Sequence, residues 1–368
     1  MNIHYLATSK IPSGSANSLQ IVKMCEALKC NGHDVKLIVP NYISNINSIT
    51  NFYYIKNKFC IRKIGKQQKD IKGLYNIIIP IFLVLDSLKD RKAQLVITRN
   101  IIVSLILIIL RKKHILELHD DLRSFGKLIS QIFKLFYLLN SKYIYKVIFI
   151  TNNLKDFISK KYNYFRSNYE ILPDATEIKN FNIKKNLKAH LNIGYFGSIY
   201  NSRGIDIILK LSKIDKINKY FIYGGDENEI ARIKKKMRST NLSLNARVPY
   251  RTIKNLLHNM DILLMPFKDK VTVKGNIGDT SRFMSPLKMF DYLGAAKIIL
   301  SSEIEVLKEI LKNNFNCIFI KNFNNIYSWK KEIDKIRISN AKYLILRKNA
   351  LKTALLFTWK KRAVDMIR

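Results

Sequence analysis

The sequence predicts an α/β fold made of two doubly wound, Rossmann-like domains. Short apolar runs alternate with helical patterns along both halves of the chain, with the connection lengths of strand–helix–strand units in a parallel sheet. At 368 residues the chain is long enough to bury two cores. Two such sheets predict domains that face each other across a cleft and bind ligands beyond the carboxyl ends of their strands.

The first half contains two strand–helix–strand units and a further strand and helix. The predicted strands are 3–7, 35–39, 95–98, 115–118 and 147–150, and the predicted helices are 18–30, 100–110 and 152–161. The Lys-rich residues 56–73 indicate a long loop or hairpin. The apolar run 101–110 is too short to span a bilayer, so we interpret it as a buried helix, with a membrane-dipping face as the alternative.

The second half repeats the pattern after a polar linker at 180–187. Its predicted strands are 191–197, 220–223 and 262–265, and its predicted helices are 204–213, 230–236 and 253–259. Residues 343–368 are expected to form one long, basic, amphipathic helix. The predicted divisions are a first domain at 1–178, a second at 179–342, and a C-terminal helix at 343–368 that packs back onto the first domain.

The most informative segment is the predicted helix that begins at Ser285. Ser285 is expected to be its N-cap, Pro286 its first residue and Gly294 its end, and an apolar run typical of a buried strand follows. Lys288 and Asp291 are one turn apart and should share a face. Free amides at a helix start beside a lysine can bind an anion, and a carboxylate can accept hydrogen bonds from a ribose. These groups suit a nucleoside diphosphate, although an ordinary capped helix is the alternative.

Other candidate residues follow predicted strands. Gly197 and Ser198 begin a strand–loop–helix segment in which Arg203 can pair with a phosphate, and a simple turn is the alternative. His119 follows a buried strand with Glu117 two residues before it; a structural histidine is the alternative. The loop around Gly14 could supply free amides, or it could be only a flexible turn.

These segments resemble family 4 of the retaining glycosyltransferases, in the branch with the motif S-P-L-K-x-[FY]-[ED]-Y. The resemblance covers nearly the whole chain and includes the Y-x-G-x-x-x-x-x-[KR]-G, E-x-H, G-G, x-V-P-[YH] and closing W-x-x-R-A segments. It implies a GT-B fold and transfer of a sugar, with retention, from a UDP- or GDP-sugar to a lipid-linked or growing surface glycan. Such a hexosyltransferase would act in lipopolysaccharide, capsule or exopolysaccharide synthesis.

The resemblance also implies residue roles. It places His119 beside the donor sugar at the reacting carbon, Asp291 on the ribose and Tyr250 near the base. The residues that it assigns to donor binding are Gly14, Gly197, Ser198, Arg203, Gly225, Val248, Tyr250, Ser285, Leu287, Lys288 and Asp291. No cofactor is expected beyond the nucleotide sugar, which is a substrate. No metal is expected, because Lys288, Arg203 and the helix amides would receive the charge of the leaving diphosphate.

The sequence departs from the family pattern at three positions. Phe283 stands where many relatives carry the first acid of an E-x₇-E pair, and the second acid is the shorter Asp291. Ser198 stands where relatives often carry an arginine. A degenerate transferase kept as a binding or scaffold protein is therefore an alternative.

The chain has 65 Lys plus Arg against 27 Asp plus Glu, a formal charge of +38. Part of this charge is explained by a general drift of the composition toward Lys, Asn and Ile. The functional interpretation is attraction to an anionic inner-membrane surface. No nucleic-acid motif accompanies the charge, so a polyanion-binding protein is the weaker alternative and nucleic acid is not an expected partner.

The expected location is the cytoplasm, peripheral on the cytoplasmic face of the membrane. The chain begins directly with a strand-like segment and shows no signal-peptide pattern. Its four cysteines have neither disulfide-like nor zinc-like spacing, which predicts reduced and mostly buried thiols.

Overall fold

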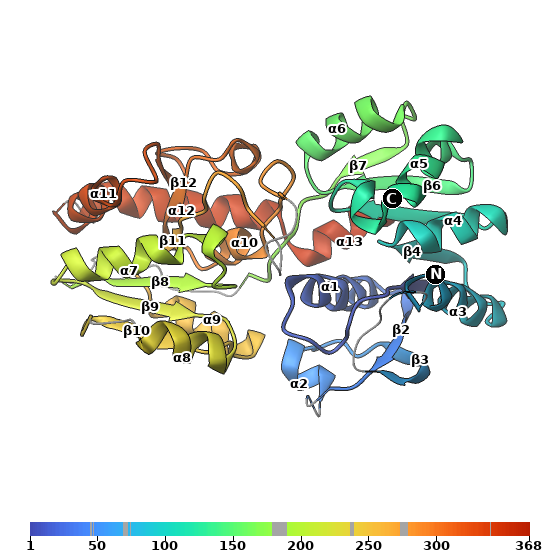
Figure 1. Ribbon diagram of the computed structural model, residues 1–368, viewed down its shortest axis with the longest axis horizontal. Coiled ribbons are helices and arrows are strands. Elements are labelled where there is room, and N and C mark those ends of the chain that lie inside the picture. The colour runs from blue at the N-terminus through green and yellow to red at the C-terminus, as the bar shows by residue number, and fades with distance from the viewer. Residues whose placement is uncertain are drawn as a thin grey trace. The chain divides into compact units, whose positions relative to one another are not determined.

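The computed structural model divides the chain into two compact units, each built around one parallel sheet (Figure 1). The structure describes residues 1–44, 46, 48–68, 73, 75–178, 190–235, 239–272, 279–338 and 340–368. Unit 1 comprises Met1–Asp174 and Trp359–Arg368, and unit 2 comprises Ala175–Thr358. The segment 180–187, expected as a linker, lies outside the described residues.

Unit 1 contains a seven-stranded sheet in the order β3-β2-β1-β4-β5-β6-β7, with parallel pairing throughout its described strands. The strands are β1 (Asn2–Leu6), β2 (Asp34–Tyr42), β3 (Cys60–Gln68), β4 (Leu95–Thr98), β5 (His114–Leu118), β6 (Ile144–Phe149) and β7 (Tyr169–Ile171). The α-helices are α1 (Ala16–Cys30), α2 (Ile49–Tyr53), α3 (Tyr75–Lys89), α4 (Ile101–Ile109), α5 (Lys127–Leu135), α6 (Asn152–Tyr162) and α13 (Trp359–Ile367). Helices α1 and α13 lie on one side of the sheet, and α3 and α4 lie on the other.

Strand β3 corrects one prediction. Residues 56–73 were expected to be a loop or hairpin, but Cys60–Gln68 pairs in parallel with β2 at the edge of the sheet. Ile64 is the buried residue of this strand, and the other residues are exposed or half-buried. The strand therefore lacks the apolar pattern of a central strand, and exposed lysines on an edge strand discourage pairing with another chain.

Unit 2 contains a six-stranded sheet in the order β10-β9-β8-β11-β12-β13, and its pairings are also parallel. The strands are β8 (Asn192–Phe196), β9 (Lys219–Tyr223), β10 (Leu242–Asn245), β11 (Ile262–Met265), β12 (Ile298–Ser302) and β13 (Ile318–Ile320). The α-helices are α7 (Ile205–Ile214), α8 (Glu227–Lys235), α9 (Tyr250–His258), α10 (Leu287–Gly294), α11 (Ile326–Ile338) and α12 (Asn340–Leu356).

Strand β11 shows how both faces of this sheet are buried. Ile262 and Leu264 belong to one apolar cluster, whereas Leu263 and Met265 belong to another. Successive side chains of a strand point to opposite faces, so these two clusters cover the two faces of the sheet. This explains why the strand appears in the sequence as an uninterrupted apolar run.

The C-terminal segment is not the single helix that its sequence predicted. Helix α12 ends at Leu356, and α13 begins at Trp359 and belongs to unit 1. Between them the chain is held by Thr176, whose backbone N–H donates to Phe357 O at 3.0 Å and which forms a β-bridge with Thr358. Phe357 also packs against Phe290, with ring centroids 5.5 Å apart. These tertiary contacts end the helix where the local sequence would allow it to continue.

Two further expectations are corrected in part. Cys25 and Cys317 are buried, but Cys30 and Cys60 are exposed, so the thiols are not mostly buried. Helix α4 packs its first turns into the core, whereas Ile109 is 69% exposed at its end. Within the part of the chain that is described, none of the helices combines the length and the apolar character required to cross a membrane.

Candidate functional site

Helix α10 begins one residue later than predicted. Pro286 occupies the N-cap position with φ −76° and ψ 122°, and no side chain caps the helix. Ser285 is therefore not the N-cap, because Pro286 itself has extended backbone and the first helical residue is Leu287. Gly294 is the last helical residue rather than a left-handed stop; the left-handed residue is Ala296, with φ 52°. A Cβ on Gly294 would lie 3.0 Å from the Thr176 side chain, so this glycine allows close packing.

Lys288 in α10 has an unusual environment. Its ammonium nitrogen is buried, has no hydrogen-bond partner, and lies 3.9 Å from the ring centroid of Tyr195 and 5.1 Å from that of Phe267. Burial, together with the charge of Arg203, lowers the pKa of Lys288 well below its usual value. Aromatic faces attract a cation but do not replace a counter-ion, so an anion bound here would gain a strong partner.

Arg203 lies near the same aromatic ring, that of Phe267. It ends the 3₁₀ turn Asn201–Arg203, and its guanidinium carbon is 5.5 Å from the ring centroid of Phe267. Its Nη2 donates to Thr272 O at 3.3 Å, while its buried Nε has no partner. Burial lowers the pKa of Arg203. Two buried cations thus face one ring, and neither has an ion-pair partner among the described residues.

Two glycines bring the backbone close to these cations. Gly197 has φ 145°, and a Cβ there would lie 2.8 Å from Lys288 Nζ. Gly204 has φ 71°, and a Cβ there would lie 1.6 Å from Pro266 O, so a side chain is excluded. The loop after β8 therefore comes against Lys288 and then turns directly into α7. The structure brings together three of the predicted donor-binding residues, namely Gly197, Arg203 and Lys288.

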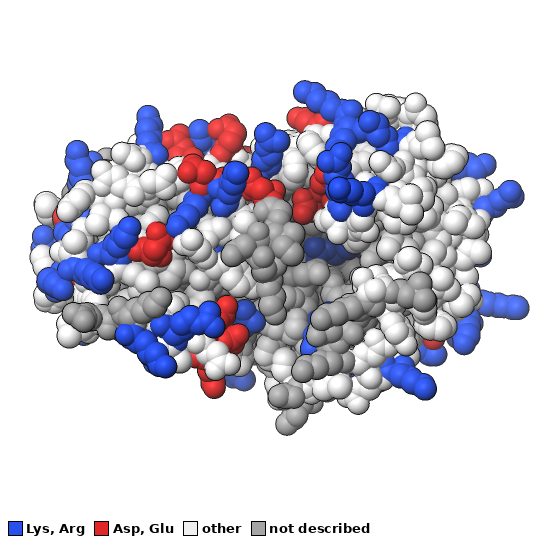
Figure 2. All heavy atoms as spheres, in the orientation of Figure 1, with Lys and Arg blue, Asp and Glu red and all other residues white. Residues whose placement is uncertain are grey.

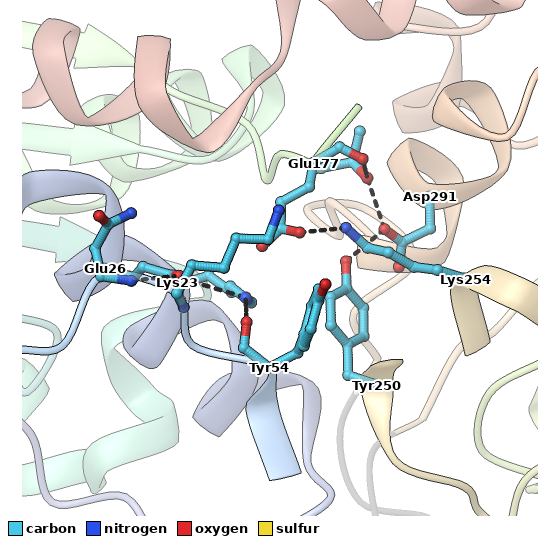
Figure 3. Close-up of polar contacts among 10 residues, drawn as sticks. Lys23, Glu26, Tyr54, Glu177, Tyr250, Lys254 and Asp291 are labelled. Atoms are coloured by element: carbon cyan, nitrogen blue, oxygen red, sulfur yellow. Dashed lines mark hydrogen bonds and ion pairs between the residues drawn. The ribbon is translucent and has the colours of Figure 1, made fainter. Parts of the chain in front are cut away.

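Asp291 lies in a separate polar cluster on the same helix (Figure 3). Its Oδ1 accepts hydrogen bonds from Thr176 Oγ1 at 2.7 Å and from the Tyr250 hydroxyl at 2.8 Å. Burial raises the pKa of Asp291 above its usual value, although Lys254 opposes the shift. Tyr250, which the resemblance places near the base, has a buried ring, and its hydroxyl supports Asp291.

A buried ion pair stands beside this carboxylate. Lys254 Nζ in α9 lies 2.5 Å from Glu177 Oε2, with side-chain exposures of 5% and 22%. Lys254 therefore has the partner that Lys288 lacks. Sequence analysis missed Thr176, Glu177 and Lys254 because no motif marks them and they become neighbours of Asp291 only when the sheet has formed.

The other predicted donor-binding residues of unit 2 have the following environments. Ser198 follows Gly197, and its carbonyl accepts a hydrogen bond from Tyr195 OH at 2.5 Å. The carbonyl of Gly225 accepts from Arg247 N at 3.1 Å, next to the half-buried Val248. Ser285 and Leu287 are buried at the start of α10.

In unit 1, Glu117 is the centre of a buried hydrogen-bond network. Its Oε1 accepts from Gln20 Nε2 at 2.8 Å and from Arg362 Nη2 at 2.7 Å, and its Oε2 accepts from the Tyr5 hydroxyl at 3.1 Å. Burial opposes ionisation of this carboxyl, but Arg362 and then His119 outweigh burial and hold the pKa of Glu117 well below its usual range. Glu117 is thus a buried carboxylate, stabilised by donors from three distant parts of the chain and by the nearby His119.

His119 is oriented by that carboxylate. Its Nε2 lies 2.7 Å from Glu117 Oε1, so the proton of the neutral ring is on Nε2 and Nδ1 can only accept a hydrogen bond. Burial, and next the charge of Arg99, lower the pKa of His119 to about 4, against the attraction of Glu117. A hydroxyl group that contacted this ring at Nδ1 would therefore have to be the hydrogen-bond donor.

Arg362 connects the end of the chain to this network. It lies in α13, and besides Glu117 it donates to Pro173 O at 2.7 Å and to Leu172 O at 2.9 Å. The W-x-x-R-A motif was interpreted only as a marker of the fold. The motif marked Arg362 in the sequence. It could not show that this arginine binds Glu117, which is far away along the chain.

The loop around Gly14 is less free than predicted. The backbone N–H of Ser13 donates to the Tyr53 hydroxyl at 2.7 Å, and that of Ser15 donates to Ser13 Oγ at 3.3 Å. These two amides are consumed inside the loop, because its serine side chains and Tyr53 supply local acceptors. Gly14 lies exposed between them.

Another polar cluster of unit 1, also shown in Figure 3, fixes the chain after α2. Lys23 Nζ donates to Glu26 Oε2 at 2.8 Å and to Tyr54 O at 3.0 Å. Glu26 Oε1 in turn accepts from Lys56 N at 2.5 Å. These bonds account for the burial of two charged side chains of α1 without any ligand.

Comparison with solved structures identifies the fold. Sucrose-phosphate synthase from Thermosynechococcus elongatus is similar to this chain with a TM-score of 0.74 and 12% identity, over 99% of this chain and 97% of that chain. A glycosyltransferase from Rickettsia africae has a TM-score of 0.71 and 15% identity, with 100% and 96% coverage. HepE from Anabaena, solved with UDP and glucose, has a TM-score of 0.70 and 11% identity, with 100% and 98% coverage. The chain has the GT-B fold that its sequence predicted.

The sequence comparisons found no match. No protein-family model matches the chain, and no curated protein sequence matches it. At 10–15% identity the structural similarity establishes the fold alone, and the activity has to be argued from the site.

We expect the free energy of unfolding to fall as the pH drops from 6.5 to 5, and His119 to contribute to this fall. Folding lowers the pKa of His119 from 6.5 to about 4, so the unfolded chain takes up a proton first and the contribution is lost toward acid. The slope should be about 1.4 kcal/mol per pH unit for this one group. Urea unfolding of the protein and of His119→Gln measures the difference, and His114, whose pKa burial also lowers to about 4, remains in both. Parallel pH profiles for the two proteins would show that His119 is not the buried neutral group described above.

We expect Lys288→Met to stabilise the free protein and weaken nucleotide binding together. Removing a buried charge that lacks a counter-ion should raise the free energy of unfolding by about 1–3 kcal/mol. The same change should lower the affinity for UDP or GDP about tenfold or more, because a charge-assisted contact is lost. Urea unfolding and isothermal titration calorimetry measure the two effects.

Lys254→Met is the matched control, since it removes a buried lysine from the same unit but breaks an ion pair. It should destabilise the protein by about 2 kcal/mol or more. Destabilisation of similar size by both substitutions would contradict the difference between the two lysines.

Proposed function

We propose that this protein is a glycosyltransferase that moves a hexose, with retention, from a UDP- or GDP-sugar to a lipid-linked or growing surface glycan. The observation that carries the proposal is the pair of buried cations, Lys288 and Arg203, beside a glycine loop in the unit with the α10 helix. A buried cation without a counter-ion is costly in the free protein, and this cost is offset when an anion binds. The membership in family 4, implied by the motifs, is part of the proposal.

The anion is proposed to be the diphosphate of the sugar donor. Sugar transfer leaves a nucleoside diphosphate whose negative charge grows as the glycosidic bond breaks, and cations placed at that charge lower the barrier. Lys288 and Arg203 supply two such cations, and Gly197 allows the ligand to approach the backbone closely. HepE, one of the structurally similar proteins, was solved with UDP and with UDP-glucose.

Asp291 is proposed to hold the ribose of the nucleotide. Tyr250 and Thr176 both donate to its Oδ1, which fixes the carboxylate in one orientation. The Oδ2 atom is then the acceptor for a ribose hydroxyl. An aspartate is shorter than the glutamate of many family members, and this support from two neighbours holds the shorter side chain in place.

His119 is proposed to contact the transferred sugar through Nδ1, as the family resemblance implies. Its neutral state and fixed tautomer suit a hydrogen bond from a sugar hydroxyl and not general acid catalysis. Glu117 is then a positioning residue, because it orients the ring without contacting the substrate.

The proposal needs neither a metal nor another cofactor, because the cations of the chain receive the diphosphate charge. The acceptor is proposed to lie at the anionic cytoplasmic face of a membrane, where the charge of +38 would favour peripheral binding. Lipopolysaccharide, capsule and exopolysaccharide synthesis are the pathways that such an acceptor implies.

We expect Asp291→Asn to remove the protein's ability to distinguish ribose from deoxyribose. The wild type should bind UDP or GDP about tenfold more tightly than the 2′-deoxy nucleotide, since one charge-assisted hydrogen bond is lost. The variant should bind both about equally, and close to the weaker value. Calorimetric titration of the wild type and the variant, each with the ribonucleotide and with the 2′-deoxy nucleotide, gives the coupling energy between Asp291 and the 2′-hydroxyl. A variant that still discriminates about tenfold would show that Asp291 does not hold the ribose.

Turnover is tested separately from binding. A thermal-shift screen of UDP- and GDP-sugars selects the donor, and transfer of labelled sugar to a membrane lipid extract, with and without EDTA, measures activity. The degenerate alternative, suggested by the buried Phe283 in place of an acid, predicts nucleotide binding with no transfer to any extract. Tight, salt-dependent binding to DNA or RNA without affinity for nucleotide sugars would favour a polyanion-binding protein instead.

A further inference from the structure

Helix α3 of unit 1 is apolar on all sides, yet one side of it is exposed. Ile79, Leu83 and Val84 pack into a core cluster with Ile38 of β2 and Val103 of α4. The outward residues are also large and apolar: Tyr75 is 49% exposed, Ile77 48%, Ile81 39%, Phe82 49% and Leu85 47%. A helix that is hydrophobic all round is normally buried, so its outer side indicates a missing partner.

An apolar groove runs beside this exposed side. It has a volume of about 540 Å³ and lies between α3 and the edge strand β3. Its walls are formed by Ile64, Phe82, Leu85 and Leu88, and charged side chains of Asp86 and Lys89 stand at it. The exposed apolar side of α3 therefore lies next to an apolar groove.

The charge around this surface selects the partner. Exposed cations lie on the neighbouring segments. Arg62 shares the face of β3 that carries Ile64, and further exposed cations stand later on β3, at the end of α3 and at the end of α4: Lys66, Lys89, Arg91, Lys92, Arg111, Lys112 and Lys113. Within the described residues 60–68 and 75–113, the acidic side chains are those of Asp86 and Asp90. Asp86 pairs with Arg62 at 2.7 Å, and Asp90 pairs with Lys36. Figure 2 shows Lys and Arg side chains projecting from the outer edge of unit 1, with uncharged side chains between them.

We propose that the exposed side of α3, with the groove beside β3, is the surface by which this protein binds an anionic membrane. The apolar side chains of α3 enter the boundary between headgroups and acyl chains, and the cations around them contact lipid phosphates. A second copy of the chain fits poorly, because it would bring a further formal charge of +38 to a cationic surface. This inference rests on the proposed function, because it names the surface by which the enzyme would reach the membrane that carries its acceptor.

The test is vesicle binding by the full chain, with no sugar donor present. Flotation with vesicles of phosphatidylglycerol and phosphatidylcholine is compared with flotation with phosphatidylcholine alone. We expect binding to the anionic vesicles that weakens with salt, and about tenfold weaker binding for Phe82→Ser/Leu85→Ser. Both residues are about half exposed, so the melting temperature should change little. Equal binding to the two kinds of vesicle would overturn the role of charge.

The matched control is Leu355→Ser/Leu356→Ser on α12 of unit 2, where the two residues are 53% and 58% exposed. This pair removes a similar apolar area and should leave vesicle binding unchanged. Equal losses in the two double variants would overturn the assignment to α3. So would self-association of the wild type that the Phe82 and Leu85 substitutions abolish while vesicle binding persists.

A fluorescence measurement places the surface directly. The native tryptophans, Trp329 and Trp359, are buried, so Phe82→Trp adds the one exposed indole on the described surface. Its emission should shift to the blue with anionic vesicles and be quenched by brominated lipid; the same substitution at Leu355 should show neither. No shift at Phe82→Trp while the protein floats with vesicles would show that another surface binds. Because UDP binding is measured without vesicles, failure of this inference is distinct from failure of the proposed activity.

Discussion

A buried positive charge without a counter-ion is the constraint on which the candidate site depends. Lys288 and Arg203 both lie near the Phe267 ring, and the aromatic faces of Tyr195 and Phe267 only partly replace the water that these cations lose. The two parallel strands of the unit 2 core that precede the loops, β8 and β11, hold Tyr195 and the chain before Phe267 rigidly in place. Among the described residues neither cation has an ion-pair partner, so an anion that binds here offsets the free-energy cost of their burial.

Lys254 and Lys288 show that the same residue type can have different roles when its surroundings differ. The Lys254 side chain and the ammonium nitrogen of Lys288 are both buried, but Glu177 neutralises Lys254 beside Asp291. The same division appears in unit 1, where Glu117 is satisfied by Gln20, Arg362 and Tyr5 and in turn fixes His119. A carboxylate that accepts several hydrogen bonds, as Glu117 does, holds its neighbours in place, whereas the ammonium group of Lys288 has no such partner and can meet a ligand.

The residues that could be predicted are those whose role depends on their immediate neighbours in the chain. The alternation of apolar strands and amphipathic helices predicted both sheets, and β11 was located residue for residue because its whole length is apolar. Gly204 was recognisable because a tight strand-to-helix turn requires a residue without a side chain. Strand β3 escaped detection because an edge strand needs no apolar pattern. Ser285 was mistaken for the cap because proline is common at the first helical position, whereas Pro286 here has extended backbone and precedes the helix.

By itself, the sequence determined the fold class, many of the central strands and helices, and a small set of residues near the ends of strands, since these follow from periodicity and local backbone chemistry. Only the tertiary structure decided which charges are paired. Lys288 and Lys254 are indistinguishable as letters in a helix, and the difference between them arises from residues that are distant in the chain. The tautomer of His119, the partner of Arg362 and the exposure of the outer side of α3 were decided in the same way, because burial and pairing are properties of the packed chain.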